Sequence, residues 1–345
     1  MIRDLQIDNF KCFRKVEAHG LGRLNVVVGA NANGKTSLLE AFDLASSSLV
    51  LQSVRTLLSF RGVEAGGKGS EQNAELLEAT FHNFDFTKSV RVNLSGDDED
   101  SRSLEILSEA PEDILSGRSG PHLSVPLQFS FRWEGAGKVI RLTSEGEDRR
   151  FTFRQQDFAA FPCGMHSSSI PRNASNVEDF SILSKENRDR QFVMAIQQEF
   201  PFIQDLSIQL DKLKPSLFAS IKGLDKKVPI GSVSDGVEKL IDIALLLYSM
   251  PPGSLLLIDQ IEDGLYYKKL EGVWRFINRV SKERKIQVIA TTHSAECLSA
   301  FYVATKLDQS DARLIRMEGS VPETSIQVIQ GSRLAAALKQ NFELR

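Results

Sequence analysis

Residues 255–265 read LLLIDQIEDGL, and this stretch decides the fold that the sequence predicts. Its first four residues are apolar, which is typical of a buried strand, and Asp259 follows at the end of that strand. A carboxylate in this position is suited to hold Mg²⁺, directly or through a water molecule, in a protein that binds a nucleoside triphosphate. The next residue is Gln260, so the same stretch also bears on whether the chain hydrolyses the nucleotide.

The phosphate-binding pattern GxxxxGK[ST] is complete in GANANGKT at 29–36. A β-branched run precedes it and predicts a strand, and an apolar stripe over residues 35–45 predicts a helix after it. In that context the glycines let backbone amides wrap around phosphates, and the helix N-terminus adds positive potential. We therefore expect Lys35 to reach the β- and γ-phosphates of ATP, and Thr36 and Asp259 to hold Mg²⁺. The predicted nucleotide-binding residues are Gly29, Asn31, Asn33, Gly34, Lys35, Thr36 and Ser37.

Two further segments fit a nucleotide site. Ser234-Asp235-Gly236 precedes an apolar helix that we predict over residues 237–248, and such a helix N-terminus can bind phosphate. His293 follows a strand predicted over residues 286–291, where its ring can contact a γ-phosphate and orient an attacking water molecule. Taken alone, the first is a common helix cap and the second is more often a structural histidine. Their order along the chain and their distance from Asp259 favour the functional interpretation.

The four elements, in this order, resemble the ABC-type AAA ATPases of the OLD-like group, named after the overcoming-lysogenization-defect nucleases. RecF and SMC-type heads are more distant relatives. The resemblance covers nearly the whole chain, and it implies an α/β fold: an ABC ATPase head, which is a P-loop NTPase, with a β-rich lobe and a helical insertion. Because no sustained heptad lies between the two nucleotide motifs, we expect no coiled coil. The segments that carry the resemblance are NFKCF at 9–13, GANANGKTSLLEAF at 29–42, SDG at 234–236, IDQIEDGL at 258–265, TTHSAECLSAF at 291–301 and the terminal FELR.

We predict one ATPase head over residues 1–345, with alternating strands and helices that build a largely parallel sheet covered on both faces. Its sub-regions are a Walker A lobe at 1–60, a β-rich lobe at 61–160, a helical insertion region at 161–230, and a lobe at 231–345 with the signature, Walker B and switch segments. After a short strand around Leu5 and Ile7, we expect strands at 24–28, 77–81, 90–94, 127–132, 139–142, 151–153, 206–210, 216–221, 255–259, 286–291, 313–317 and 325–329. The expected helices lie at 35–45, within 175–200, and at 237–248, 266–281 and 332–341.

The resemblance implies that two heads close head-to-tail as a homodimer or a higher even oligomer. Each ATP would then lie between one Walker A segment and the partner's signature serine, here Ser234. The D-loop would be Glu262-Asp263-Gly264. The family also has a Q-loop glutamine between its lobes; Gln155 or Gln156 is available for this role, and a plain surface glutamine explains either residue equally well.

The chain departs from the family pattern directly after Asp259. Relatives usually have a glutamate there, which polarises the attacking water, and a histidine where this chain has Tyr266. Gln260 keeps the size and hydrogen bonding of glutamate but cannot accept the proton, so we expect ATP to bind and hydrolysis to slow by orders of magnitude. Three explanations remain open: a deliberate Glu→Gln substitution, a natural slow ATPase that works as a nucleotide-gated switch, or a neighbour such as Glu262 that replaces the base.

Composition narrows the class of protein. The net charge of −3 gives no overall basic field for nucleic acid, although local patches remain compatible with it. The three cysteines, Cys12, Cys163 and Cys297, form no CxxC pair and fit free thiols in a reducing compartment. There is no apolar signal segment at the N-terminus and no apolar run long enough to span a bilayer. We therefore expect a cytoplasmic protein with no membrane partner.

Only about 50 residues follow His293, without an acidic cluster for two catalytic metals, so we expect no nuclease in this chain. By resemblance, such heads work beside a separately encoded effector, commonly a nuclease or toxin, in bacterial antiphage defence. The leading hypothesis is an ATP-gated sensor or scaffold of this kind. The alternative is a RecF-like or SMC-like DNA-repair ATPase that clamps DNA when ATP closes the heads, with nucleic acid as its partner. A transporter ATPase fits least, because the NFKCF start and the TTHS switch argue against it.

Overall fold

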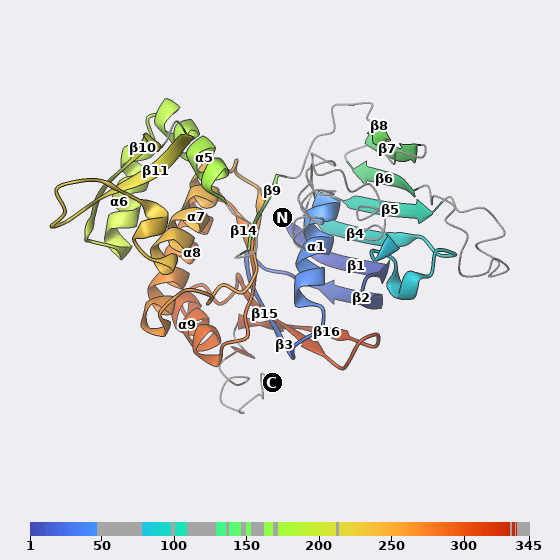
Figure 1. The fold of residues 1–345 in the computed structure, drawn as a ribbon. Coiled ribbons are helices and arrows are strands. Elements are labelled where there is room, and N and C mark those ends of the chain that lie inside the picture. Colours follow the sequence, from blue (N-terminus) through green and yellow to red (C-terminus); the bar gives the residue numbers. More distant parts are fainter. Residues whose placement is uncertain are drawn as a thin grey trace.

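The computed structural model places a central sheet between a group of helices and a second sheet (Figure 1). The structure describes residues 1–46, 78–97, 101–108, 129–135, 138–145, 150–152, 162–167, 172–211 and 214–331, together with residues 333, 334 and 336. Within these ranges, no helix is both long enough and apolar enough to cross a membrane.

The central sheet has six strands in the order β16-β15-β3-β14-β13-β9. Five of them run parallel, and β16 pairs antiparallel with β15, which confirms the predicted largely parallel sheet. The inner strands are apolar and buried over nearly their whole length because both faces of the sheet are covered. Because β3, β14 and β13 run parallel, their carboxyl ends meet at one edge of the sheet. The bounds are β3 Leu24–Gly29, β9 Cys163–His166, β13 Leu255–Ile258, β14 Gln287–Thr291, β15 Ala312–Glu318 and β16 Ser325–Gln330.

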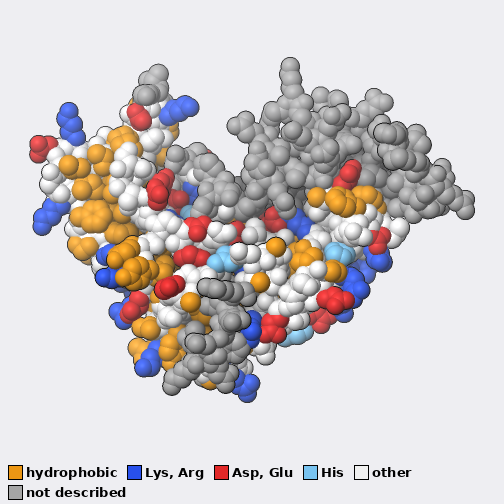
Figure 2. Space-filling view, turned by 60° about the horizontal axis from the view of Figure 1, so that its bottom comes forward, with side chains coloured by type: hydrophobic (Ala, Val, Ile, Leu, Met, Phe, Trp, Pro, Cys, Tyr) orange, Lys and Arg blue, Asp and Glu red, His pale blue; other side chains and the backbone are white. Residues whose placement is uncertain are grey.

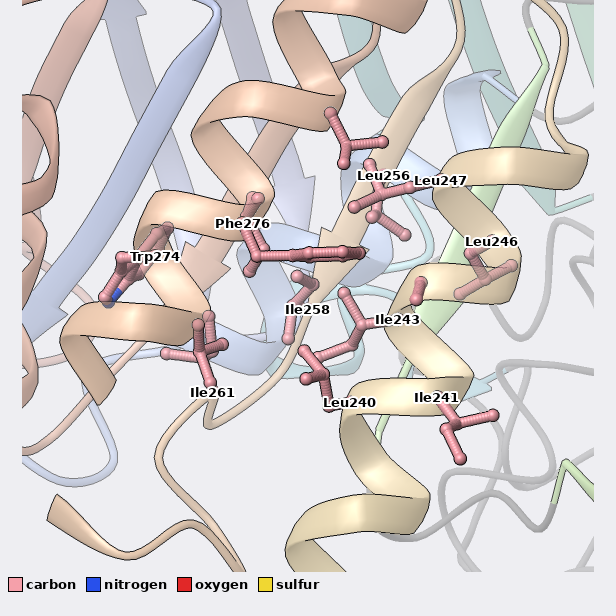
Figure 3. Close-up of a cluster of buried hydrophobic side chains, with 14 of the residues drawn as sticks. Leu240, Ile241, Ile243, Leu246, Leu247, Leu256, Ile258, Ile261, Trp274 and Phe276 are labelled. Carbon is pink, nitrogen blue, oxygen red and sulfur yellow. The ribbon is translucent and has the colours of Figure 1, made fainter. Parts of the chain in front are cut away.

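Three helices cover one face of this sheet: α7 Asp235–Ser249, α8 Leu270–Arg284 and α9 Ala295–Thr305. Figure 3 shows Leu240 and Ile243 of α7 and Phe276 of α8 directed toward Leu256 and Ile258 of β13. All of these side chains are buried, so α7 is held against the strand that ends at the site described below.

The other face of the central sheet carries α1 Lys35–Ser46, which also contacts an antiparallel sheet of seven strands. This second sheet is the predicted β-rich lobe, with the N-terminal hairpin added to it. Its order is β2-β1-β4-β5-β6-β7-β8. The bounds are β1 Ile2–Phe10, β2 Phe13–His19, β4 Val90–Gly96, β5 Arg102–Ser108, β6 Phe129–Gly135, β7 Lys138–Glu145 and β8 Arg150–Thr152.

The helical insertion packs against α7, on the side of the molecule away from the seven-stranded sheet (Figure 1). Two helices, α5 Asn173–Lys185 and α6 Asp189–Glu199, pack with a small sheet in the order β10-β11-β12. The strands are β10 Ile203–Asp211, β11 Lys214–Ile221 and β12 Val228–Pro229. Single 3₁₀ turns occur at His82–Phe84, Ile230–Ser232 and Tyr267–Lys269.

Five strands and helices were not predicted: β2, β5, β9, β12 and α9. The strand β9 has only four residues, CGMH, without the alternation or β-branched content that marks a strand, and it comes from the region expected to be helical. In the segment expected as a strand at 77–81, residue 78 is helical, residues 79 and 80 form a turn, and Phe81 makes a single bridge to Phe10, so that expectation is wrong for the described residues. The helix expected to begin at 266 begins at Leu270, after the 3₁₀ turn. Most of the closing helix at 332–341 lies outside the described residues.

Replacing Phe301 with alanine tests how α9 packs. Phe301 is fully buried, and its ring centroid lies 4.7 Å from that of Trp274. We expect Phe301→Ala to lower the free energy of unfolding by about 3–5 kcal/mol, because it removes buried apolar surface and leaves a cavity. Urea unfolding followed by circular dichroism measures the change. Val303→Ala, at a position 44% exposed on the same helix, should cost less than about 0.5 kcal/mol. Equal losses would contradict this packing.

Candidate functional site

The loop of residues 30–34 joins β3 to α1 and folds back over the first helical side chain. The Lys35 amine donates hydrogen bonds to the backbone oxygens of Gly29 and Ala30, both at 2.7 Å. Gly34 has φ +89°, and a Cβ there would lie 2.5 Å from Cys12 Sγ and 2.6 Å from the Phe13 ring. Only glycine therefore fits at this point, where the loop meets the turn of the N-terminal hairpin.

The charge of Lys35 is set by its surroundings. Burial lowers the pKa of the Lys35 amine to about 8, while the nearby carboxylates of Asp259 and Glu262 act in the opposite direction. A buried amine whose charge is disfavoured by desolvation gains most from a strong anion placed beside it. The loop is thus suited to bind an anion with a full negative charge, whereas the carbonyl oxygens of Gly29 and Ala30 that now accept from Lys35 carry only partial charges.

Two threonine hydroxyls hold the Asp259 carboxylate. Thr36, the second residue of α1, donates to Oδ2 at 3.1 Å, and Thr291, the last residue of β14, donates to Oδ1 at 2.6 Å. The Asp259 backbone N–H donates to the carbonyl oxygen of His166, the last residue of β9, at 2.8 Å. One aspartate therefore joins four elements at the carboxyl edge of the sheet.

Gln260 has a left-handed backbone, with φ +48°. Its N–H donates to Thr291 Oγ1 at 2.8 Å, and its carbonyl oxygen accepts from Lys239 Nζ at 2.7 Å. A non-glycine residue in this conformation costs of order 1–3 kcal/mol and persists only where neighbours fix it. Such residues cluster at functional sites. Here the hydrogen bonds fix the backbone N–H and carbonyl oxygen of Gln260 and do not involve its side chain.

Glu262 and His293 meet at the same edge. The His293 backbone N–H donates to Glu262 Oε1 at 2.7 Å, and within the described part of the chain Glu262 Oε2 is buried without a hydrogen-bond partner. The His293 side chain is exposed at the surface, and partial burial together with Lys35 lowers the pKa of its ring. The neutral imidazole therefore predominates at pH 7, which leaves one ring nitrogen able to accept a proton.

The segment 234–236 begins α7 and packs on the segment 262–264. Ser234 Oγ accepts the N–H of Val237 at 3.3 Å as the helix cap, and Ser234 and Asp235 are exposed. A Cβ on Gly236 would lie 2.9 Å from the Gly264 carbonyl oxygen, so the two segments touch closely. No hydrogen bond among the described residues joins Ser234–Gly236 to the loop 29–34 of the same chain.

The structure thus brings Gly29, Lys35, Thr36, Asp259, Gln260, Glu262 and His293 to one edge of the central sheet. Asn31 is exposed at the start of the loop; Asn33 is buried, its amide 3.5 Å from the Met317 carbonyl oxygen; Ser37 hydrogen-bonds Cys12. Asp263, half-buried, donates its N–H to the Gln260 carbonyl oxygen at 3.0 Å. Gln155 and Gln156 lie outside the described residues.

Sequence reasoning missed three residues that hold this edge in place: His166, Lys239 and Thr291. The signal for Lys239 is that it and Asp242 are charged residues on a helix that is mostly apolar on its buried side, VEKLIDIALLLY. Thr291 lies in the same ATTHS segment that pointed to His293. His166 could not be found, because it belongs to the unpredicted strand β9.

Comparison with known protein families gives the same assignment as the geometry. Residues 24–299 match the family described as "AAA domain, putative AbiEii toxin, Type IV TA system". The chain belongs to this AAA-domain family. Together with the sheet order and the site, the match confirms the predicted P-loop ATPase of the AAA/ABC type.

Individual relatives of this AAA domain are distant. A protein named ATP/GTP phosphatase from Helicobacter pylori is 21% identical over 324 residues, which cover 86% of each chain. An uncharacterized protein from Methanocaldococcus jannaschii is 29% identical over 136 residues, covering 36% of this chain and 62% of that protein. Among solved structures, an SMC head bound to the C-terminal winged-helix domain of ScpA has a TM-score of 0.50 at 14% identity, covering 98% of this chain and 99% of that one. That likeness supports the ABC-head fold alone.

Thr291→Val tests whether the hydroxyl between Asp259 and Gln260 holds the site. Valine keeps the shape but leaves Asp259 Oδ1 and the Gln260 N–H each without this partner. We expect the free energy of unfolding to fall by about 1–3 kcal/mol in a urea titration. The control is Thr305→Val on α9, where a buried hydroxyl donates only to carbonyl oxygens of its own helix, at 2.8 and 3.5 Å. That variant should lose less than about 1 kcal/mol, and equal losses would contradict the special role of Thr291.

Proposed function

We propose that the chain is an ATP-gated, oligomeric ATPase of the OLD-like group that senses or scaffolds for a separately encoded effector, a nuclease or toxin, in antiphage defence. In this proposal, residues 1–345 act as one head. The observation that carries it is the arrangement of Lys35, Thr36 and Asp259, which places an amine, a hydroxyl and a carboxylate at the N-terminus of α1. The name of the phosphatase relative supports hydrolysis, and the family description, which names a putative toxin of a type IV TA system, supports a link to a toxin system.

The residues present fit Mg²⁺-ATP. Backbone amides of residues 29–34 and the start of α1 would cradle the phosphates, and Lys35 would regain its full charge against them. Thr36 and Asp259 supply hydroxyl and carboxylate oxygens, the donors that Mg²⁺ prefers, and their oxygens are already 3.1 Å apart. The metal ion would neutralise charge that develops on the phosphates. His293 would contact the γ-phosphate.

A second head would complete the site. Ser234 and Asp235 are exposed at the N-terminus of α7 and make no hydrogen bond to the phosphate loop of their own chain. An exposed helix N-terminus of this kind is suited to a phosphate that another chain holds. This supports a homodimer or a higher even oligomer closed head-to-tail by ATP, with residues 262–264 beside the contact.

A mixing experiment tests the head-to-tail arrangement. Lys35→Met should abolish the phosphate site, and Ser234→Arg should block the signature face, so neither variant alone should dimerise in saturating Mg²⁺-ATP. An equimolar mixture contains pairs in which an intact Walker A segment meets an intact signature, and we expect dimers to reappear. Light scattering after size exclusion measures this. A mixture that stays monomeric while the original chain dimerises contradicts the arrangement. An original chain that stays monomeric contradicts ATP gating itself.

Gln260→Glu tests why turnover should be slow. Restoring a general base should raise the rate of phosphate release by about 10²-fold or more, with little change in the Kd for Mg²⁺-ATP, because the contacts at Asp259 and Lys35 are untouched. Glu262→Gln in the original chain tests the explanation that Glu262 replaces the missing base. Glu262 Oε2 is a buried acceptor with no partner among the described residues. If Glu262 is the base, its replacement removes the residual rate and Gln260→Glu adds little.

A further inference from the structure

A polar stripe runs along α7, which is otherwise mostly apolar. Gly236, Lys239 and Asp242 are spaced three residues apart and so share one face of the helix. Lys239 and Asp242 are only 6% and 7% exposed. Charged side chains are rarely buried to this extent without partners, because desolvation disfavours them. Their partners therefore show what this face of α7 is built to hold.

Gly236 and Lys239 contact the segment after β13, and Asp242 contacts the neighbouring strand β9. Gly236 packs on the Gly264 carbonyl oxygen, and Lys239 Nζ donates to the Gln260 carbonyl oxygen at 2.7 Å. Asp242 Oδ2 lies 3.4 Å from His166 Nε2, and the His166 carbonyl oxygen in turn accepts the Asp259 N–H. One helix thus bears on residues 260 and 264, and on the strand β9 whose last carbonyl oxygen accepts the Asp259 N–H.

The Asp242 contact also reaches the helical insertion. Asp242 Oδ1 accepts from Asn176 Nδ2 of α5 at 2.5 Å, and Asn176 is 1% exposed. A carboxylate shared between α5, α7 and β9 fixes the helix relative to the sheet. With α7 held there by Asp242 and by its apolar face (Figure 3), Lys239 approaches Gln260 from a rigid support.

Lys239 donates its hydrogen bond to Gln260, a residue with a strained backbone. The left-handed backbone of Gln260 is sparsely populated for a residue with a side chain, and it persists only when its surroundings determine it. Thr291 holds the N–H of this residue, and Lys239 and the Asp263 N–H hold its carbonyl oxygen. Of these groups, only Lys239 belongs to the helix that carries Ser234 at its N-terminus.

We propose that Lys239 is a positioning residue that makes the geometry of residue 260 depend on α7. This inference rests on the proposed function, in which Ser234 meets the nucleotide of a second head. A change at the N-terminus of α7 then reaches residue 260 through the partly buried hydrogen bond from Lys239, so that the attacking water is aligned only when a partner occupies the signature end. Lys239 does not touch the nucleotide in this scheme, and nucleotide affinity does not depend on it.

A double-mutant cycle measures this coupling. In the Gln260→Glu background, Lys239→Met should lower kcat for ATP hydrolysis by about 10- to 100-fold, because a small misplacement of a catalytic group has an effect of that size. The Kd for Mg²⁺-ATP should stay the same. In the original chain, with glutamine at 260, the same substitution should change the residual rate far less, since no base is there to misplace. The two effects are therefore non-additive, as expected for residues that act through one another.

The control is Lys227→Met, which removes a lysine bound to Asp205 and Ser207 on the small insertion sheet, both at 2.8 Å. It should leave both rates and the Kd unchanged. An equal fold-loss from Lys239→Met in both backgrounds would mean a merely structural role and would overturn the proposal. A weakened Kd would overturn it as well, because it would place Lys239 in nucleotide binding.

Amide hydrogen exchange of the nucleotide-free chain tests the same contact without catalysis. Lys239→Met should speed exchange at the amides of residues 260, 261 and 263 several-fold, and should leave the amides of β14 protected. Unchanged exchange at all three residues would overturn the positioning role. If Gln260→Glu restores no hydrolysis, the catalytic part of the proposed function fails, and the exchange measurement still decides the role of Lys239.

Discussion

Two threonine hydroxyls hold the Asp259 carboxylate where three parallel strands end, and the rest of the site is arranged around that contact. Thr36 belongs to the helix that opens after β3, and Thr291 closes β14. Because β14 lies between β3 and β13 in the sheet, the hydroxyls reach the carboxylate from two elements on the same side of β13. A shift of any of these elements would break a buried or partly buried hydrogen bond, so the sheet order and the site geometry constrain each other.

The helices α7, α8 and α9, which cover the face of the sheet opposite α1, matter for a different reason. The apolar side of α7 packs on β13, and its polar stripe contacts the residues that follow β13. The helix α7 therefore supports both the strand β13, through its apolar side chains, and residue 260 after the strand, through Lys239. Since a Cβ on Gly236 would lie 2.9 Å from the Gly264 carbonyl oxygen, the segments 234–236 and 262–264 pack closely together. In the proposed dimer, a partner that contacts either segment would therefore act on both.

The local chemistry of this site was predictable from sequence, and its assembly was not. GANANGKT and the run into Asp259 carry their own context of strand, turn and helix, so the positions of Lys35, Thr36 and Asp259 followed from short-range pattern. Thr291 and His166 contribute through strand order, which a single sequence leaves undetermined. Lys239 was not identified from the sequence, because which side of a helix is buried, and against what, depends on packing between distant segments.

The contacts around Gln260 separate binding from turnover in physical terms. Its restraints act on its backbone N–H and carbonyl oxygen, and Asp259 is held by groups that do not involve the side chain at 260. Exchanging glutamate for glutamine there leaves this frame of hydrogen bonds intact and changes only the ability of the side chain to accept a proton. In the proposed function, a head with this frame would hold Mg²⁺-ATP between two subunits without a proton acceptor at residue 260. Residue 260 would then set the lifetime of the closed state rather than its formation.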